Sequence, residues 1–129
     1  MAKNTRTVFP TLEEALHLHN RLLEVFGGAP GVRDPGLLES ALARPRSGYY
    51  ESLSLQAAAL MQSLARNHAF LDGNKRVAFA LTAVFLLTNG SSLNVDTDEA
   101  ESFLIDQVIV GHADIVVIAE WLERFLKQV

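Results

Sequence analysis

The chain of 129 residues contains no cysteine. This absence excludes a disulfide framework and a thiolate metal centre, and it fits the reducing cytoplasm. The first residues also lack the apolar core of a signal peptide. The longest apolar run, residues 77–87, reaches only about half the length that a bilayer requires. We therefore expect a cytoplasmic protein without a membrane segment.

Positive charge is scarce too, with 11 Lys and Arg residues against 15 Asp and Glu residues and a formal net charge of −4. A nucleic-acid-binding domain normally presents a basic field, so we expect no direct contact with nucleic acid. A local basic patch is still compatible with this composition. Its candidate members are Arg44, Arg46, Arg66, Lys75 and Arg76.

Hydrophobic residues, by contrast, make up 49% of the chain, which is enough for the core of a single domain spanning residues 1–129. Their spacing is helical in six stretches, whereas strand patterns are weak and limited to residues 7–9 and 92–95. The sequence therefore predicts an all-α fold. The expected helices cover residues 12–26, 35 to about 44, 54–67, 73 or 74 to 88, 97 to about 110, and 115–126.

Local signals mark several helix ends. Thr11 and Glu14 form a predicted capping box, and an aspartate precedes the second helix and another precedes the last. Asp96 together with Glu99 is expected to cap the fifth helix. The fourth helix is apolar nearly all round, which predicts a central, buried helix with the others packed around it.

The polar sequence HAFLDGNKR, residues 68–76, lies between the third and fourth expected helices. The first turn of a helix has unpaired backbone amides and carries about half a positive charge, so it can bind an anion. Gly73 would let an anionic group come close to the backbone. Asn74 could donate from its side-chain amide, Lys75 could add a point charge, and Arg76 could bind a phosphate through two hydrogen bonds.

Two further residues of this stretch bring reactive chemistry. The imidazole of His68 could take a proton from a hydroxyl group. Asp72 could hold a Mg²⁺ ion, which proteins often bind through one carboxylate together with substrate phosphates. The set indicates phosphoryl or nucleotidyl transfer. A plainer interpretation stays open, in which His68 packs or caps, Asp72 is only an N-cap, and the two cations lie in a solvated turn.

The same nine residues resemble the signature of the Fic/Doc family. That signature is a histidine, any residue, phenylalanine, two residues of which the second is acidic, glycine or alanine, asparagine, glycine or lysine, and arginine. The segment GGAPGVRDPGLLESALARP, residues 27–45, and the short chain are typical of the Doc branch, the "death on curing" toxins. The resemblance covers roughly residues 12–126 and implies a compact Fic/Doc-like bundle of about six helices around one buried central helix.

The resemblance also implies a role for each residue of the motif. His68 would be the general base that deprotonates a target hydroxyl, and Phe70 would anchor the loop in the core. Asp72 would hold the Mg²⁺ that bridges the phosphates of ATP, and Gly73 and Asn74 would belong to the anion-binding turn.

Lys75 and Arg76 bear on the group that is transferred. By similarity Arg76 clamps a phosphate, but Lys75 stands where AMP-transferring members have glycine. In the Doc branch this cation fills part of the phosphate site, so that ATP binds the other way round and presents its γ-phosphoryl group. Gly73 is less decisive, because it is the residue of AMP-transferring members whereas some Doc proteins carry alanine.

The implied function is that of the toxin in a toxin–antitoxin pair. Such a toxin is an ATP-dependent kinase of a translation protein, with a threonine of elongation factor Tu as the family's target, and it inhibits translation. A small antitoxin would bind as a helix in an apolar groove and cover the cleft near Tyr49 and Tyr50. Two alternatives stay open: transfer of AMP to a protein hydroxyl, and a non-catalytic module that binds an anion and a partner.

The stretch before the third helix, residues 46–53, is expected to be irregular. In the family this excursion is a flap that holds the target segment, so Arg44, Arg46, Tyr49 and Tyr50 could line the substrate entrance. A solvated turn explains these four residues equally well.

The remaining histidines are weaker candidates. His17 and His19 are two residues apart on a helix and therefore face different directions, so they cannot share a metal ion. We expect them to have surface and core roles. His112 follows a glycine that ends a helix, and we expect it in a loop.

Overall fold

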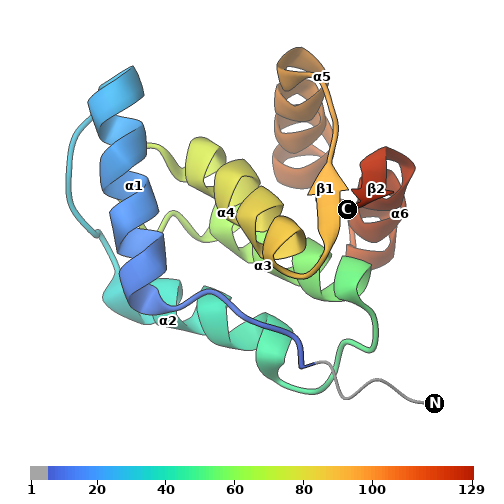
Figure 1. The fold of residues 1–129 in the computed structure, drawn as a ribbon. Helices are drawn as coiled ribbons and strands as arrows, with labels where there is room; N and C mark the ends of the chain where they lie inside the picture. Colours follow the sequence, from blue (N-terminus) through green and yellow to red (C-terminus); the bar gives the residue numbers. More distant parts are fainter. Residues whose placement is uncertain (1–5) are drawn as a thin grey trace.

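The computed structural model describes residues 6–129 and confirms the all-α fold (Figure 1). Within these residues a 3-10 turn, η1 (Arg44–Arg46), follows the second helix, and a π-helix, η2 (Phe103–Val110), continues the fifth. Two short strands, β1 (Ser91–Leu93) and β2 (Leu126–Gln128), complete the fold. The α-helices are α1 (Leu12–Phe26), α2 (Pro35–Ala43), α3 (Leu53–Asn67), α4 (Asn74–Thr88), α5 (Thr97–Ser102) and α6 (Ile115–Phe125).

The helices begin where side chains can accept hydrogen bonds from the unpaired backbone amides of the first turn. At α1 the predicted capping box is present, because Thr11 accepts a hydrogen bond from the amide of Glu14 and the Glu14 carboxylate accepts one from the amide of Thr11. Asp34 and Asp114 cap α2 and α6, where one carboxylate oxygen of each accepts a hydrogen bond from a backbone amide of the first turn. Ser52 caps α3, which therefore begins one residue earlier than predicted.

The helix at the centre of the bundle is α3, which packs against α4, α6, α2 and η1. Figure 1 shows α1 and α2 on one side of the α3–α4 pair, and α5 and α6 on the other. The sequence predicted α4 as the central helix, but its Val84 and Leu87 are 49% and 55% exposed. The small side chains at residues 57–59 explain the difference, because they let neighbouring helices approach α3 closely.

One of the two strand predictions is confirmed, since β1 overlaps residues 92–95, and the other needs correction. Residues 7–9 form no strand; the backbone of Val8 instead exchanges two hydrogen bonds, both of 2.8 Å, with the side-chain amide of Asn89. β1 pairs in antiparallel fashion with β2, so that Leu93 lies opposite Leu126. Leu126, which we expected in the last helix, therefore begins a strand. This pairing joins segments more than 30 residues apart, and a local pattern cannot show it.

The fifth helix also differs in detail from the prediction. It widens after Ser102 into the π-helix η2, which ends where the amide of Gly111 donates to the carbonyl of Asp106. Asp96 caps α5 as predicted, but Glu99 is not its capping-box partner, since Glu99 accepts a hydrogen bond from the indole of Trp121. No helix in residues 6–129 is long and apolar enough to cross a bilayer.

Candidate active site

Residues 68–76 form the turn from α3 into α4, and two residues with positive φ shape it. His68 follows the last residue of α3 with a φ of 54°, and Gly73 precedes the first residue of α4 with a φ of 81°. His68 is exposed. Only its backbone carbonyl takes part in a hydrogen bond within residues 6–129, so the imidazole is available to a substrate. This is the arrangement that a general base requires.

The connection between α1 and α2, residues 27–34, holds this turn in place. The side chain of Arg33 donates to the carbonyls of His68 and Asn67, at 2.6 Å and 3.2 Å. Its backbone amide donates to the carbonyl of Ala69 at 2.7 Å. Arg33 thereby donates hydrogen bonds to carbonyls at the C-terminal end of α3, where the helix dipole is negative. The backbone position of His68 is therefore fixed from outside the nine-residue stretch.

Phe70 anchors the turn in the core, as expected, with 1% of its surface exposed. Its amide donates to Oδ1 of Asn74 at 3.0 Å, and Nδ2 of Asn74 donates to its carbonyl at 2.9 Å. The side-chain amide that we expected to face an anion thus braces the turn, and the backbone amide of Asn74 is the group left for a ligand.

The carboxylate of Asp72 is held by backbone amides and still faces solvent. Oδ1 accepts from the amide of Gly73 at 2.9 Å, and Oδ2 accepts from the amide of Ala29 at 3.1 Å. These two hydrogen bonds, with smaller contributions from the charges of Arg76 and His19, hold the pKa of Asp72 below its ordinary value. The carboxylate is therefore ionised at neutral pH.

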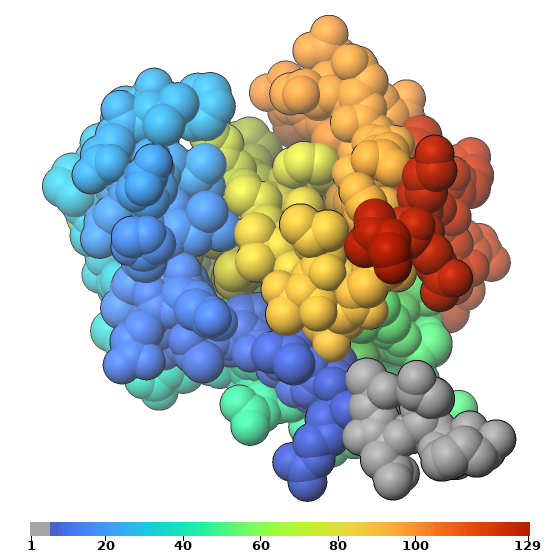
Figure 2. Space-filling view, viewed as in Figure 1, coloured from blue at the N-terminus to red at the C-terminus, as the bar shows by residue number. Residues whose placement is uncertain are grey.

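The two cations lie on the first turn of α4. Lys75 and Arg76 are exposed, and neither forms an ion pair within the described residues. The guanidinium of Arg76 lies over the ring of Phe26 at 4.5 Å from the ring centroid, a cation–π contact that leaves its N–H edge free. Figure 2 shows the surface hollowed between the end of α1 and α5, with the yellow-green α3–α4 region at its floor.

These residues fit a phosphate group and a Mg²⁺ ion together. Each oxygen of Asp72 accepts one backbone hydrogen bond and keeps further lone pairs for a cation. The first-turn amides of α4 and the two cations would provide contacts for a phosphate. In the described part of the chain no cluster of three or more His, Asp or Glu side chains could hold a metal ion. Mg²⁺ bound through one carboxylate and substrate phosphates needs no such cluster.

The excursion between η1 and α3 is attached to α3 by its own hydrogen bonds. Arg44 is part of a network with Tyr50, Gln62 and Ser63, in which its guanidinium donates to all three at 2.8–2.9 Å. These contacts attach the excursion to the side of α3, and within residues 6–129 no hydrogen bond or aromatic contact joins it to the turn. Arg46 and Tyr49 are exposed, and Tyr49 meets Tyr50 edge to face.

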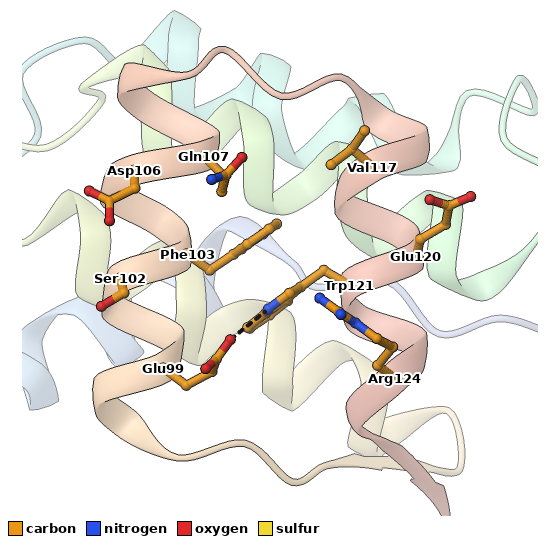
Figure 3. Close-up of a pocket in the computed structure, with 9 residues that line it drawn as sticks. All are labelled: Glu99, Ser102, Phe103, Asp106, Gln107, Val117, Glu120, Trp121 and Arg124. Carbon is orange, nitrogen blue, oxygen red and sulfur yellow. Dashed lines mark hydrogen bonds between the residues drawn. The ribbon is translucent and has the colours of Figure 1, made fainter.

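A groove lies elsewhere on the molecule, between α5–η2 and α6 (Figure 3). It has a volume of about 560 Å³, and Phe103 and Trp121 stack at 4.1 Å in its wall. Glu99, Asp106 and Glu120 line it against one cation, Arg124. Its excess of carboxylates disfavours a nucleotide, and it contains no residue of the 68–76 stretch.

Two residues that shape the turn had no assigned role in the sequence. Arg33 belongs to the segment that resembles the Doc branch, so its position could have suggested a contact with the motif. His19 was expected in the core or at the surface. It is buried, its ring stacks on Phe70 with 3.9 Å between centroids, and Nε2 lies 2.8 Å from the carbonyl oxygen of Asp72. His17 is exposed, which completes the expected pair of roles.

The sequence is similar to one protein family and to two named proteins. The sequence model of the Fic/DOC family matches residues 9–86, a range that contains the whole turn, α1 and the α1–α2 connection that contacts it. The chain is 47% identical over 107 residues to a protein named Toxin Doc from Mycolicibacterium smegmatis, covering 78% of this chain and 82% of the relative. It is 32% identical over 116 residues to Protein kinase doc of Escherichia phage P1, covering 87% and 90%. The chain therefore belongs to the Fic/DOC family.

Proposed function

We propose that this chain is a cytoplasmic toxin of the Doc type, a kinase that transfers the γ-phosphoryl group of ATP to a hydroxyl of a translation protein. The observation that carries the proposal is the exposed His68, whose imidazole is free of hydrogen bonds within residues 6–129, at the turn into α4 beside the Asp72 carboxylate. The relatives support it, because one is named a toxin and the other a protein kinase.

The proposed reaction uses the turn as follows. A ring nitrogen of His68 accepts the proton of the target hydroxyl while its oxygen forms a bond to the γ-phosphorus. The bond from that phosphorus to the bridging oxygen breaks, and ADP leaves. The first-turn amides of α4 and Arg76 face the charge on the phosphate oxygens. Mg²⁺ held by Asp72 would neutralise part of that charge.

Lys75 supports transfer of the phosphoryl group. It is exposed and lies on the first turn of α4, whose amides would receive the α-phosphate in AMP transfer. Lys75→Gly should weaken or redirect the transfer while Arg76 still binds a phosphate. Mass spectrometry of the target separates the outcomes, since AMP adds a nucleoside and phosphate does not.

The target that we propose is a threonine of elongation factor Tu, whose modification would stop translation. The test incubates the chain with elongation factor Tu and ATP labelled at either the α- or the γ-phosphate. Label from the γ-position alone, absent with His68→Ala, is the expected result. Label from the α-position would establish the alternative, AMP transfer. No label in either case, with a folded protein, would leave the alternative of a non-catalytic binding module.

We also propose a small antitoxin that docks as a helix. An apolar groove of about 420 Å³ lies between residues 8–10, α1 and α4, and it includes the half-exposed Val84. Arg46, at the start of the excursion that carries Tyr49 and Tyr50, lies over the ring of Phe9 in this groove. A helix in the groove could therefore reach the excursion. A reading frame beside the gene that encodes a small protein able to suppress toxicity is the expected finding.

A further inference from the structure

His19 makes two contacts with the turn although it belongs to α1. Its ring stacks on Phe70 at an angle of 19°, and its Nε2 is 2.8 Å from the carbonyl oxygen of Asp72. Only 3% of the residue is exposed. Because a carbonyl oxygen can only accept, Nε2 must carry a proton in this contact. His19 is thus a buried donor aimed at the backbone of the residue whose carboxylate faces the ligand site.

The contact of His19 is linked to the Asp72 carboxylate by one peptide unit. The carbonyl of Asp72 and the amide of Gly73 belong to the same planar trans peptide and point in opposite directions. His19 holds the carbonyl end, and the amide end donates to Oδ1 of Asp72 at 2.9 Å. Rotation of this peptide would break both hydrogen bonds and release the carboxylate on that side.

The second carboxylate oxygen depends on the same geometry. Oδ2 accepts from the amide of Ala29, which lies beyond the end of the helix that carries His19. The peptide unit, the carboxylate and the end of α1 are therefore joined in one closed set of contacts. Gly73 has a φ of 81° and no side chain, so it cannot hold the peptide unit in place of the His19 ring.

We propose that His19 is a positioning residue for Asp72, which orients the carboxylate toward the nucleotide site by fixing the peptide unit between Asp72 and Gly73. The effect on nucleotide binding rests on the proposed function, but the positioning of Asp72 can be measured without any ligand. His19 itself does not touch the substrate in this proposal.

Two substitutions separate positioning from simple packing. In His19→Gln the side-chain nitrogen can occupy the place of Nε2 and donate to Asp72, whereas in His19→Asn the nitrogen corresponds to Nδ1 and falls short. Both lose the aromatic stack on Phe70. His17→Asn, two residues away on the exposed face, is the matched control. Thermal unfolding of all three variants reports any general loss of packing.

The first experiment measures amide hydrogen exchange in the free protein, without ATP or metal. We expect exchange at Gly73 and Ala29 to become about tenfold faster in His19→Asn and to stay within about threefold of wild type in His19→Gln and His17→Asn. The amide of Leu60, buried in α3, should not change. Equal acceleration in the Gln and Asn variants, acceleration that includes Leu60, or none at all would overturn the inference.

The second experiment measures the binding of ATP by calorimetry at a series of Mg²⁺ concentrations. His19→Asn should raise the Mg²⁺ concentration needed for half-maximal binding by about tenfold or more, and His19→Gln should largely restore it. If the wild type binds no ATP at any Mg²⁺ concentration, the proposed function fails, while the exchange experiment still decides the positioning role. If ATP binds but its Mg²⁺ dependence is the same in all variants, the inference is overturned.

Discussion

Gly28 is the residue with the least room for a side chain near the proposed Mg²⁺ site. Its φ is +123°, and a Cβ there would lie 2.9 Å from Oδ2 of Asp72. We predict that Gly28→Ala displaces the carboxylate and abolishes Mg²⁺-dependent phosphoryl transfer. The strained backbone should also lower the free energy of unfolding by about 1–3 kcal/mol. Transfer assays and urea denaturation measure the two effects.

The neighbouring glycine provides a control for the strain alone. Gly27 has a φ of +81°, but a Cβ there would meet nothing within 4 Å. Gly27→Ala should therefore lose stability to a similar extent and retain its activity. Equal loss of activity in both variants would show that the conformation of the connection matters and the clash with Asp72 does not.

The titration of Asp72 predicts a pH dependence of stability. Amides of Ala29 and Gly73 hold the pKa of Asp72 in the folded protein below its ordinary value of 3.8. A carboxyl group whose pKa is lowered by folding stabilises the fold fully at pH values above its pKa in the unfolded chain. This stabilisation disappears as the pH falls through its pKa in the folded protein. The wild type should therefore exceed Asp72→Asn in free energy of unfolding by a constant amount at neutral pH.

That difference should shrink once the pH falls below about 4. Urea denaturation of both proteins across this range is the measurement, and the Asn variant supplies the reference because it has no titrating group at this position. A difference that grows toward acid pH would mean that Asp72 is not held by these amides.

Among the larger elements, the connection between α1 and α2 does the most to set the geometry of the turn. Arg33 reaches two carbonyls at the end of α3 with one planar guanidinium, and a lysine ammonium cannot reproduce this fork. We predict that Arg33→Lys lowers the free energy of unfolding by about 1 kcal/mol and reduces transfer. Chemical denaturation and the transfer assay check the two parts.

The control is Arg21→Lys, which alters the exposed pair of Arg21 with Glu24 at 3.5 Å. Such a pair contributes only tenths of a kcal/mol, so neither stability nor transfer should change measurably. If Arg33→Lys behaves like Arg21→Lys, the capping contacts of Arg33 do not stabilise the turn.

For the molecule as a whole, the apolar groove between α1 and α4 is the surface on which an antitoxin helix would act. Val84 is 49% exposed in this groove, and a carboxylate in its place would have to be desolvated by an apolar helix. Val84→Asp should therefore weaken antitoxin binding by tenfold or more, on the order of 1–3 kcal/mol, and leave the toxicity of the free protein intact.

Val116, on α6, is 56% exposed and lies outside this groove, which makes Val116→Asp the matched control. Co-expression with the antitoxin and calorimetry of the purified pair give the comparison. Suppression of both variants to the same degree would place the antitoxin on another surface.

The sequence by itself determined where most of the helices lie and which residues stand together in the turn. Local signals such as the capping box at Thr11 and the glycines after Phe26 act within a few residues, so their outcome can be read from a short segment. The turn of residues 68–76 belongs to the same class. His68, Asp72 and the two cations are neighbours in the chain, and the start of α4 brings its amides to them.

Only the tertiary structure decided what holds that set in place. His19 and Arg33 are 53 and 35 residues away from their partners in the turn, and the β1–β2 pairing and the central place of α3 also depend on distant segments. The attachment of Arg44 to the side of α3 also depends on a distant segment. Such contacts follow from how helices pack, and packing depends on the side chains of several elements at once. Caps and turns depend on the residues of one short segment.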